Sequence, residues 1–132
     1  MSTVLLVEDS EMFHELIKRV FASDKLEWAR TGKEAIEIYK KSKPDIVLMD
    51  VILPDMNGIE AIKKIKSIDK NAKIIVLTGI DYDEVREDAI RAGAVDYISK
   101  NAGVSYLKQR VYEEISEYQK SSAGHGPMQS RQ

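Results

Sequence analysis

The sequence predicts an α/β fold in which five parallel strands alternate with five helices, (βα)5. Short apolar runs recur along the chain, and four of them are followed directly by a polar or charged residue. The segments between the runs carry apolar residues at helical spacing. Strands joined by single helical crossovers pair in parallel with right-handed connections, which gives a doubly wound sheet covered on both faces.

Composition limits the class of protein. The chain has 132 residues, 43% of them hydrophobic, a net charge of −2 and no cysteine. One domain fits this length, and the longest apolar run, about five residues, is too short to span a membrane. The small net charge gives no broad basic field for nucleic acid, and the missing cysteines exclude disulfides and thiolate zinc sites. The N-terminus has no cationic leader, so we expect a cytoplasmic protein.

The first two strand and helix pairs are predicted from apolar runs and caps. Residues 4–7 form a buried strand, and Ser10 is an N-cap for the helix that follows. Residues 26–29 form a weaker strand. A capping box that begins at Thr31 predicts the second helix, which Pro44 ends.

The third strand is the clearest of the five. Residues 46–49 are four unbroken apolar residues that end at Asp50, as expected for a strand buried on both faces. Asn57 caps the third helix. Residues 74–77 form the next buried strand, and Thr78 follows it.

The last predicted elements are a fourth helix, a fifth strand and a final helix. Capping-box spacing that begins at Asp81 predicts a fourth helix, which ends at Gly93. This helix has the poorest apolar stripe, so we expect it to shift most easily. Residues 95–98 form a fifth strand, and a final helix covers about residues 104–118.

The composition changes near the C-terminus. From residue 121 onward the chain is rich in Ser, Gly, Pro, Gln and His, which cannot offset the entropy cost of ordering. We therefore predict one domain over residues 1–120, with residues 121–132 as a flexible tail, a linker or an expression remnant.

Five side chains follow the predicted strands and should meet at one edge of the sheet, the usual ligand-binding edge of an α/β fold: Glu8, Asp9, Asp50, Thr78 and Lys100. Three carboxylates would repel one another unless a cation neutralised them, and Mg²⁺ prefers such oxygen ligands. A lysine and a hydroxyl supply donors for a phosphoryl group. The set suits phosphoryl transfer, with a carboxylate as a nucleophile that forms an aspartyl phosphate.

These residues, in this order and spacing, closely resemble the response-regulator receiver domain of two-component signalling, the CheY-like family. The resemblance covers residues 2 to about 119. It implies the flavodoxin-like strand order 2-1-3-4-5. It also implies a domain that takes a phosphoryl group from a sensor histidine kinase or a phosphotransfer protein, and that is a signalling domain and not a turnover enzyme.

The resemblance assigns roles to individual residues. It implies that Asp50 is the phosphoacceptor and that Glu8, Asp9 and Asp50 hold Mg²⁺, with Mn²⁺ as an alternative. The backbone carbonyl of Ile52 would be a further ligand.

The resemblance also implies a switch. Thr78 would donate its hydroxyl to the phosphoryl group, Lys100 would pair with it, and Tyr97 would turn inward as the switch aromatic. The surface of the fourth helix, fifth strand and fifth helix would then bind a downstream effector or a linked output domain.

Two features bear on how closely the family pattern is followed. Asn101 stands where proline usually follows the lysine, so we expect a trans bond or a strained loop there. Asp96 and Arg110 match one of the charged pairs through which active receivers of transcription factors dimerise. In a second pair Arg86 is present, but Tyr106 takes the place of its acidic partner. We therefore leave open a monomer or a phosphorylation-dependent dimer.

Other classes of protein remain as alternatives. A degenerate receiver could act as a constitutive interaction scaffold, although the complete acid, hydroxyl and lysine set argues against it. A flavodoxin would need a Ser/Thr/Gly-rich phosphate loop after the first strand, where this chain has Glu8 and Asp9. A haloacid-dehalogenase phosphatase would need Asp-x-Asp there, which is also absent from the sequence.

Overall fold

A computed structural model describes residues 1–79 and 82–123, with side chains as far as Ser116. Its single sheet has five parallel strands in the order β2-β1-β3-β4-β5, which confirms the predicted fold class and strand order. The strands are β1 (Thr3–Val7), β2 (Lys25–Ala29), β3 (Ile46–Asp50), β4 (Ile74–Thr78) and β5 (Asp96–Ser99). Each lies within one residue of its predicted position at both ends.

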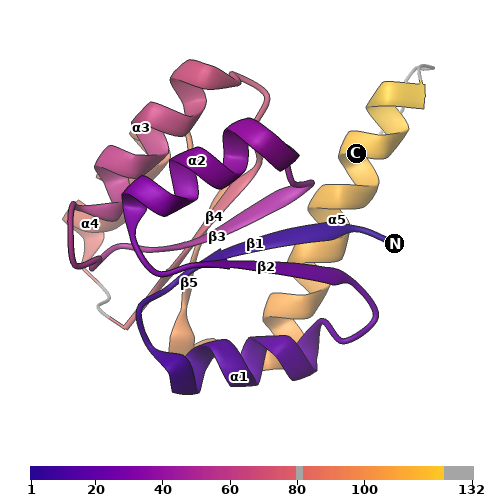
Figure 1. Ribbon diagram of the computed structural model, residues 1–132, viewed down its shortest axis with the longest axis horizontal. Helices are drawn as coiled ribbons and strands as arrows, with labels where there is room; N and C mark the ends of the chain where they lie inside the picture. The colour runs from indigo at the N-terminus through magenta and orange to yellow at the C-terminus, as the bar shows by residue number, and fades with distance from the viewer. Residues whose placement is uncertain (80–81, 124–132) are drawn as a thin grey trace.

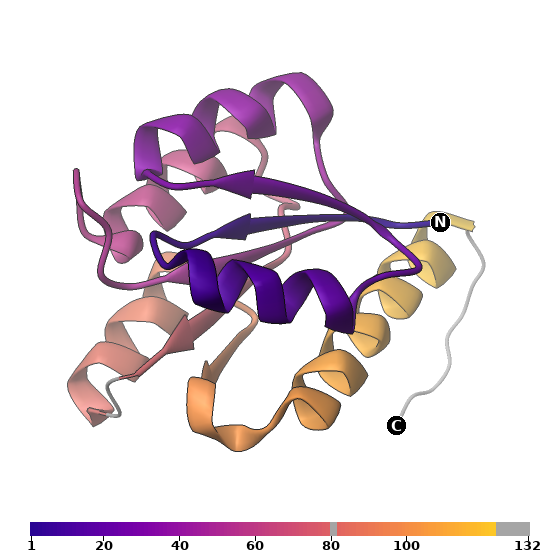
Figure 2. The same cartoon turned by 60° about the horizontal axis from the view of Figure 1, so that its bottom comes forward.

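Five α-helices cover the two faces of this sheet. They are α1 (Glu11–Val20), α2 (Gly32–Ser42), α3 (Gly58–Ile68), α4 (Asp83–Ala92) and α5 (Val104–Ala123), with a short 3-10 helix, η1 (Lys100–Ala102), after β5. Helices α2, α3 and α4 lie on one face and α1 and α5 on the other (Figures 1 and 2).

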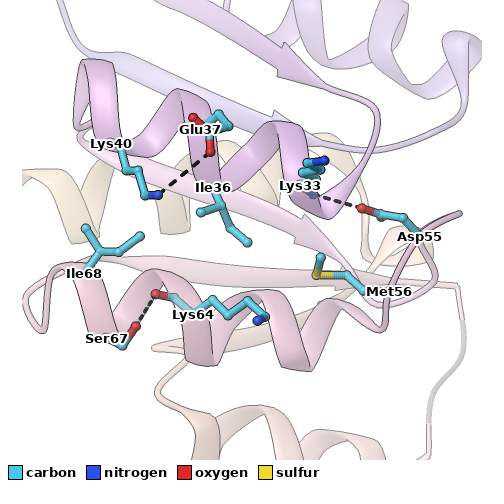
Figure 3. Close-up of a pocket in the computed structure, with 9 residues that line it drawn as sticks. All are labelled: Lys33, Ile36, Glu37, Lys40, Asp55, Met56, Lys64, Ser67 and Ile68. Carbon is cyan, nitrogen blue, oxygen red and sulfur yellow. Dashed lines mark hydrogen bonds and ion pairs between the residues drawn. The ribbon is translucent and has the colours of Figure 1, made fainter.

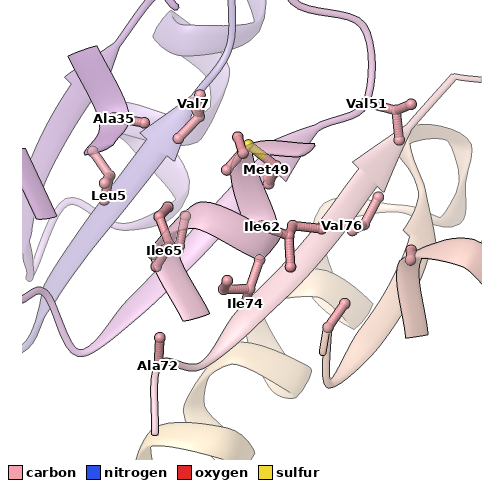
Figure 4. Close-up of a cluster of buried hydrophobic side chains, with 14 of the residues drawn as sticks. Leu5, Val7, Ala35, Met49, Val51, Ile62, Ile65, Ala72, Ile74 and Val76 are labelled. Atoms are coloured by element: carbon pink, nitrogen blue, oxygen red, sulfur yellow. The ribbon is translucent and has the colours of Figure 1, made fainter. Parts of the chain in front are cut away.

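The core is two apolar layers, one on each face of the sheet. All residues of β3 and β4 are buried, because helices cover both sides of the central strands. One layer packs against α2, α3 and α4 and includes Leu5, Met49, Ile62 and Ile65 (Figure 4). The other packs against α1 and α5. The carboxyl edge of the sheet lies between these layers and is left to polar side chains.

Side-chain caps fix the starts of the first three helices, as predicted. Ser10 Oγ accepts a hydrogen bond from the backbone N–H of Phe13 at 3.1 Å, and Thr31 Oγ1 accepts one from Glu34 at 3.0 Å. The Glu34 carboxylate accepts from the N–H of Arg30 at 2.8 Å, one residue before the cap. Asn57 Oδ1 accepts a hydrogen bond from the backbone N–H of Ile59, in the first turn of α3, at 2.8 Å.

The fourth helix does not begin where its capping box predicts. Asp81 lies outside the described residues, and the N-cap is Tyr82, which makes no side-chain capping hydrogen bond. Tyr82 has an extended backbone, with φ −111° and ψ 135°, so helical geometry starts only at Asp83. The predicted glycine end is confirmed, because Gly93 has φ 118°, a left-handed conformation. Ala89 is the one buried residue of α4.

The last helix is longer than predicted, and the loop after β5 has one of its two predicted forms. Helix α5 ends at Ala123 and not near residue 118. Residues 124–132 lie outside the described part of the chain, so the division near residue 120 stays a prediction. The described residues contain no cis peptide bond, and the bond before Asn101 is therefore trans, one of the two expected outcomes. Across the same residues, no helix is long and apolar enough to cross a membrane.

Candidate functional site

Three of the predicted site residues meet at the carboxyl edge of the sheet. Asp50 is the last residue of β3, Glu8 directly follows β1, and Lys100 directly follows β5. The Lys100 ammonium lies 2.7 Å from Glu8 Oε1 and 3.2 Å from Asp50 Oδ2. One cation therefore joins two carboxylates that come from different strands.

Both carboxylates are buried and use their second oxygen on the backbone. Glu8 is 3% exposed and Asp50 is 8% exposed. Glu8 Oε2 accepts a hydrogen bond from the N–H of Ser10 at 2.9 Å, and Asp50 Oδ1 accepts one from the N–H of Ile52 at 3.2 Å. These bonds fix the orientation of each carboxylate and leave Lys100 to balance the charge.

The electrostatics of the pair follow from burial and contact. Burial raises the pKa of Glu8, and this effect exceeds the lowering by the hydrogen bonds from Lys100 and Ser10. Burial lowers the pKa of Lys100, but the hydrogen bond to Glu8 and the charges of Asp50 and Glu8 outweigh it, so its pKa is raised. Lys100 therefore stays charged at neutral pH.

Aromatic side chains lie next to Lys100 and to the backbone of Glu8. Lys100 Nζ lies 4.6 Å from the centroid of the Phe13 ring, on α1. The indole N–H of Trp28 donates to the backbone carbonyl of Glu8 at 2.8 Å, and His14 stacks on Trp28 with ring centroids 3.7 Å apart. The sequence indicates Phe13 only as part of an apolar stripe. The one sequence signal for its position is its spacing of three residues from the Ser10 cap, which places it in the first turn of α1, close to Glu8.

The predicted metal ligands are only partly brought together. Glu8 and Asp50 share one positive charge, so the place that Lys100 fills between their oxygens suits a cation. Asp9 is exposed, and the described residues contain no group of three acidic or histidine side chains close enough to hold a metal ion. The four-ligand set that includes Asp9 and the carbonyl of Ile52 therefore stays a prediction.

The loop between β3 and α3 folds tightly against Asp50. The N–H of Gly58 donates to the carbonyl of Val51 at 2.7 Å, and Ile52 and Asn57 form an isolated bridge. A Cβ atom at Gly58 would lie 2.1 Å from the carbonyl oxygen of Asp50, so a side chain is excluded there. This close approach fixes the loop that carries Ile52, whose side chain is 61% exposed.

The same loop is tied to α2, beside a groove of about 440 Å³ between α2 and α3. The Asp55 carboxylate accepts from the N–H groups of Gly32 and Lys33 at 2.8 and 3.0 Å. Ile36 projects from α2 into the groove, and Lys64 lies along α3 on its other side (Figure 3). None of the predicted site residues lines this groove, so it is separate from the carboxylate pair.

The two predicted switch residues lie on neighbouring strands. Thr78 is the last residue of β4 and is 1% exposed. Tyr97, on β5, is 5% exposed, and the guanidinium carbon of Arg86 lies 4.8 Å from the centroid of its ring. Tyr97 is therefore packed inward, between the sheet and α4.

The charged pair that matches the family's dimer contacts forms within the chain. Arg110 Nε lies 2.6 Å from Asp96 Oδ2. Its Nη1 lies 2.8 Å from Glu113 Oε1, and its Nη2 lies 2.8 Å from Glu114 Oε2. Burial lowers the pKa of Arg110, but these hydrogen bonds outweigh it and the pKa is raised. Arg110 thus joins α5 to β5 inside one molecule.

The architecture and the site together define a protein of the α/β, flavodoxin-like CheY fold, with a carboxylate pair and a lysine at the carboxyl edge of the sheet. The chain belongs to the response regulator receiver domain family, which it matches over residues 4–112.

Known proteins agree with this assignment. The chain is 41% identical over 120 residues to the chemotaxis protein CheY of Thermotoga maritima, covering 89% of this chain and 97% of that protein. A CheY-like receiver domain from Methanospirillum hungatei has a TM-score of 0.86 at 27% identity, and the match covers 92% of this chain and 98% of that one. CheY in the CheX-CheY-BeF3-Mg+2 complex of Borrelia burgdorferi has a TM-score of 0.80 at 30% identity, and the match covers 85% of this chain and 87% of that one.

Proposed function

We propose that this receiver domain accepts a phosphoryl group on Asp50, from a sensor histidine kinase or a phosphotransfer protein, in a Mg²⁺-dependent reaction. The observation that carries the proposal is the position of the Asp50 carboxylate. It ends a central strand, is 8% exposed, and lies 3.2 Å from the ammonium of Lys100. A buried nucleophile beside a fixed cation is what transfer of an anionic phosphoryl group requires.

The chemistry of the transfer needs few groups. A carboxylate oxygen of Asp50 forms a bond to phosphorus while the N–P bond of the donor's phosphohistidine breaks, and the bonding electrons stay with the imidazole nitrogen. Lys100 pairs with the phosphoryl oxygens, and the hydroxyl of Thr78 donates to one of them. A divalent cation held by Glu8, Asp9, Asp50 and the carbonyl of Ile52 would neutralise charge on the carboxylates and the phosphoryl group.

The same proposal includes a readout surface. Movement of Thr78 toward the phosphoryl group would act on Tyr97, and through it on the surface formed by α4, β5 and α5. Helix α4 has one buried residue and no side-chain cap, so little free energy holds it in place. A coupling of about 1–3 kcal/mol is enough to change the affinity for a partner severalfold.

The partner would be a downstream effector protein or a linked output domain. The Borrelia relative, which forms a complex with CheX, supports a protein partner. Water later hydrolyses the aspartyl phosphate, so the domain is a self-resetting switch and not a turnover enzyme. The proposal implies a cytoplasmic location.

Intact mass after incubation with acetyl phosphate tests this proposal. We expect the native chain to gain one phosphoryl group with Mg²⁺ and none with EDTA. The Asp50→Asn variant should gain none, whereas Asp83→Asn, which changes an exposed carboxylate on α4, should behave as the native chain does. A gain by Asp50→Asn would place the acceptor elsewhere.

The second candidate is a phosphorylation-independent scaffold. It is favoured by one observation, that Lys100 already forms ion pairs with both Glu8 and Asp50 while Asp9 is exposed. No mass gain under any condition, together with no Mg²⁺ binding by calorimetry, would support the scaffold and reject the phosphoacceptor.

A further inference from the structure

We propose that Phe13 is a positioning residue for Lys100, holding the ammonium beside Asp50 when the charges on the neighbouring carboxylates change. This inference rests on the proposed function, because it concerns the lysine that would bind the phosphoryl group. Phe13 does not touch the reacting atoms. It acts through Lys100.

The geometry joins two distant segments. Phe13 lies in the first turn of α1, and Lys100 begins the η1 turn after β5. The ammonium lies 4.6 Å from the ring centroid, within the roughly 6 Å at which a cation is attracted to an aromatic face. The Lys100 side chain is only 22% exposed, so water screens this attraction less than it would at the surface.

The ring is itself held in place. The N–H of Phe13 donates to Ser10 Oγ at 3.1 Å, and the N–H of Ser10 donates to Glu8 Oε2 at 2.9 Å. Phe13 also packs against the apolar layer beneath α1 and α5. The aromatic ring and the Glu8 carboxylate therefore belong to one fixed segment, and both face the same ammonium.

The need for a third contact follows from the chemistry of the site. Lys100 is now held by Glu8 and Asp50, but a cation bound to these carboxylates would cancel much of their attraction for it. A lysine side chain has four flexible carbons and loses about 2 kcal/mol of rotamer entropy when it is fixed. The Phe13 ring does not bind metal and does not titrate, so its attraction for Lys100 persists in the loaded site.

Substitutions at position 13 separate the aromatic face from simple packing. Phe13→Leu keeps an apolar side chain but removes the ring, Phe13→Tyr keeps the ring, and Met12→Leu changes the adjacent residue, which is 84% exposed. We expect Phe13→Leu to slow phosphorylation by acetyl phosphate at saturating Mg²⁺ roughly 2- to 5-fold. Phe13→Tyr and Met12→Leu should keep the native rate.

Mg²⁺ affinity distinguishes the proposed role of Phe13 from general damage to the site, because damage would weaken Mg²⁺ binding. Trp28 is the only tryptophan of the chain, and its indole N–H donates to the backbone of Glu8, so its fluorescence should report on the metal ligands. Phe13→Leu should bind Mg²⁺ as tightly as the native chain or slightly more tightly, because the competing ammonium is held less firmly. Weaker Mg²⁺ binding in Phe13→Leu would indicate structural damage and overturn the proposal.

Reactivity of the Lys100 amine tests the contact without phosphorylation. In Mg²⁺, acetic anhydride should acylate Lys100 roughly 2- to 5-fold faster in Phe13→Leu than in the native chain, as measured by peptide mass spectrometry, with Phe13→Tyr at the native rate. Equal reactivity in all variants would overturn the positioning role. A native chain that accepts no phosphoryl group would instead reject the proposed function, and the acylation result would still decide the role of Phe13.

Discussion

Lys100 determines the charge balance of the site. Its ammonium contacts Glu8 and Asp50, which are both buried and which each have one oxygen committed to a backbone N–H. Without this cation the two carboxylates would face each other with little solvent between them. The raised pKa of Glu8, caused first by burial, shows how costly its charge already is.

Replacing this lysine should therefore destabilise the fold through repulsion between Glu8 and Asp50. We expect Lys100→Met to lower the free energy of unfolding by about 1–3 kcal/mol in EDTA, because it leaves buried carboxylates without a partner. Added Mg²⁺ should recover part of the loss, since a divalent cation can replace the missing charge. Urea unfolding in EDTA and in Mg²⁺ measures both values.

The matched control is Lys63→Met, which removes an exposed lysine on α3. It should change the unfolding free energy by less than about 0.5 kcal/mol in either condition. An equal loss for Lys100→Met with and without Mg²⁺ would contradict the replacement of the lysine charge by the ion.

Among the elements, the loop between β3 and α3 is held by close backbone contacts. It must turn sharply after Asp50, and it does so by bringing Gly58 against the backbone of Asp50 and Val51. The bridge between Ile52 and Asn57 closes the turn. The position of the Ile52 carbonyl, a predicted metal ligand, thus depends on a glycine outside the carboxylate cluster.

A methyl group at Gly58 should displace this loop. In Gly58→Ala the new Cβ would meet the Asp50 carbonyl oxygen at 2.1 Å, and no side-chain rotation can relieve a clash with backbone. We expect a loss of about 2 kcal/mol or more in unfolding free energy, measured by urea denaturation, and slower phosphorylation.

Gly79→Ala is the control, because a Cβ at Gly79 meets nothing within 4 Å. It should stay within about 0.5 kcal/mol of the native chain. A native-like Gly58→Ala would show that the loop can move without cost, and that the fold does not require glycine at this position.

At the scale of the whole molecule, a side-chain hydrogen bond joins α2 to the end of α3 on one face of the sheet. The hydroxyl of Tyr39, on α2, donates to Asp69 Oδ2 at the end of α3 at 2.7 Å. This hydrogen bond lowers the pKa of Asp69, with a further contribution from the N–H of Asn71, and partial burial opposes it. The charged form of Asp69 is therefore favoured in the folded state.

The sign of the pH dependence follows from that lowered pKa. The stabilisation by Asp69 is fully present above its ordinary pKa of 3.8 and is lost as the pH falls through the lower folded value. We expect Tyr39→Phe to cost about 1 kcal/mol at pH 7 and less at pH 3, where the native chain loses the same interaction. Urea unfolding at pH 7, 5 and 3 measures the difference.

Tyr106→Phe, at a tyrosine that is 46% exposed on α5, should have little effect at any of these pH values. A cost for Tyr39→Phe that stays constant from pH 7 to pH 3 would contradict the role of the Asp69 charge. It would instead indicate a loss of packing, because Tyr39 is 2% exposed.

The sequence by itself determined the strands, the first three helix caps and the edge at which Glu8, Asp50, Thr78 and Lys100 lie. These features are local, since a buried strand needs only a short apolar run and a cap only a polar residue at the right spacing. The parallel order then places all strand ends together. At the start of α4 the capping-box spacing places the helix one residue too early, because Tyr82 keeps an extended backbone.

Only the tertiary structure decided which of these side chains touch. It pairs Lys100 with Glu8 and Asp50, places Phe13 beneath the ammonium, and leaves Asp9 exposed next to a buried neighbour. It also forms the Arg110 pair inside one chain. Such contacts depend on the relative positions of segments far apart in sequence, to within a fraction of an ångström, and no local pattern of residues carries that information.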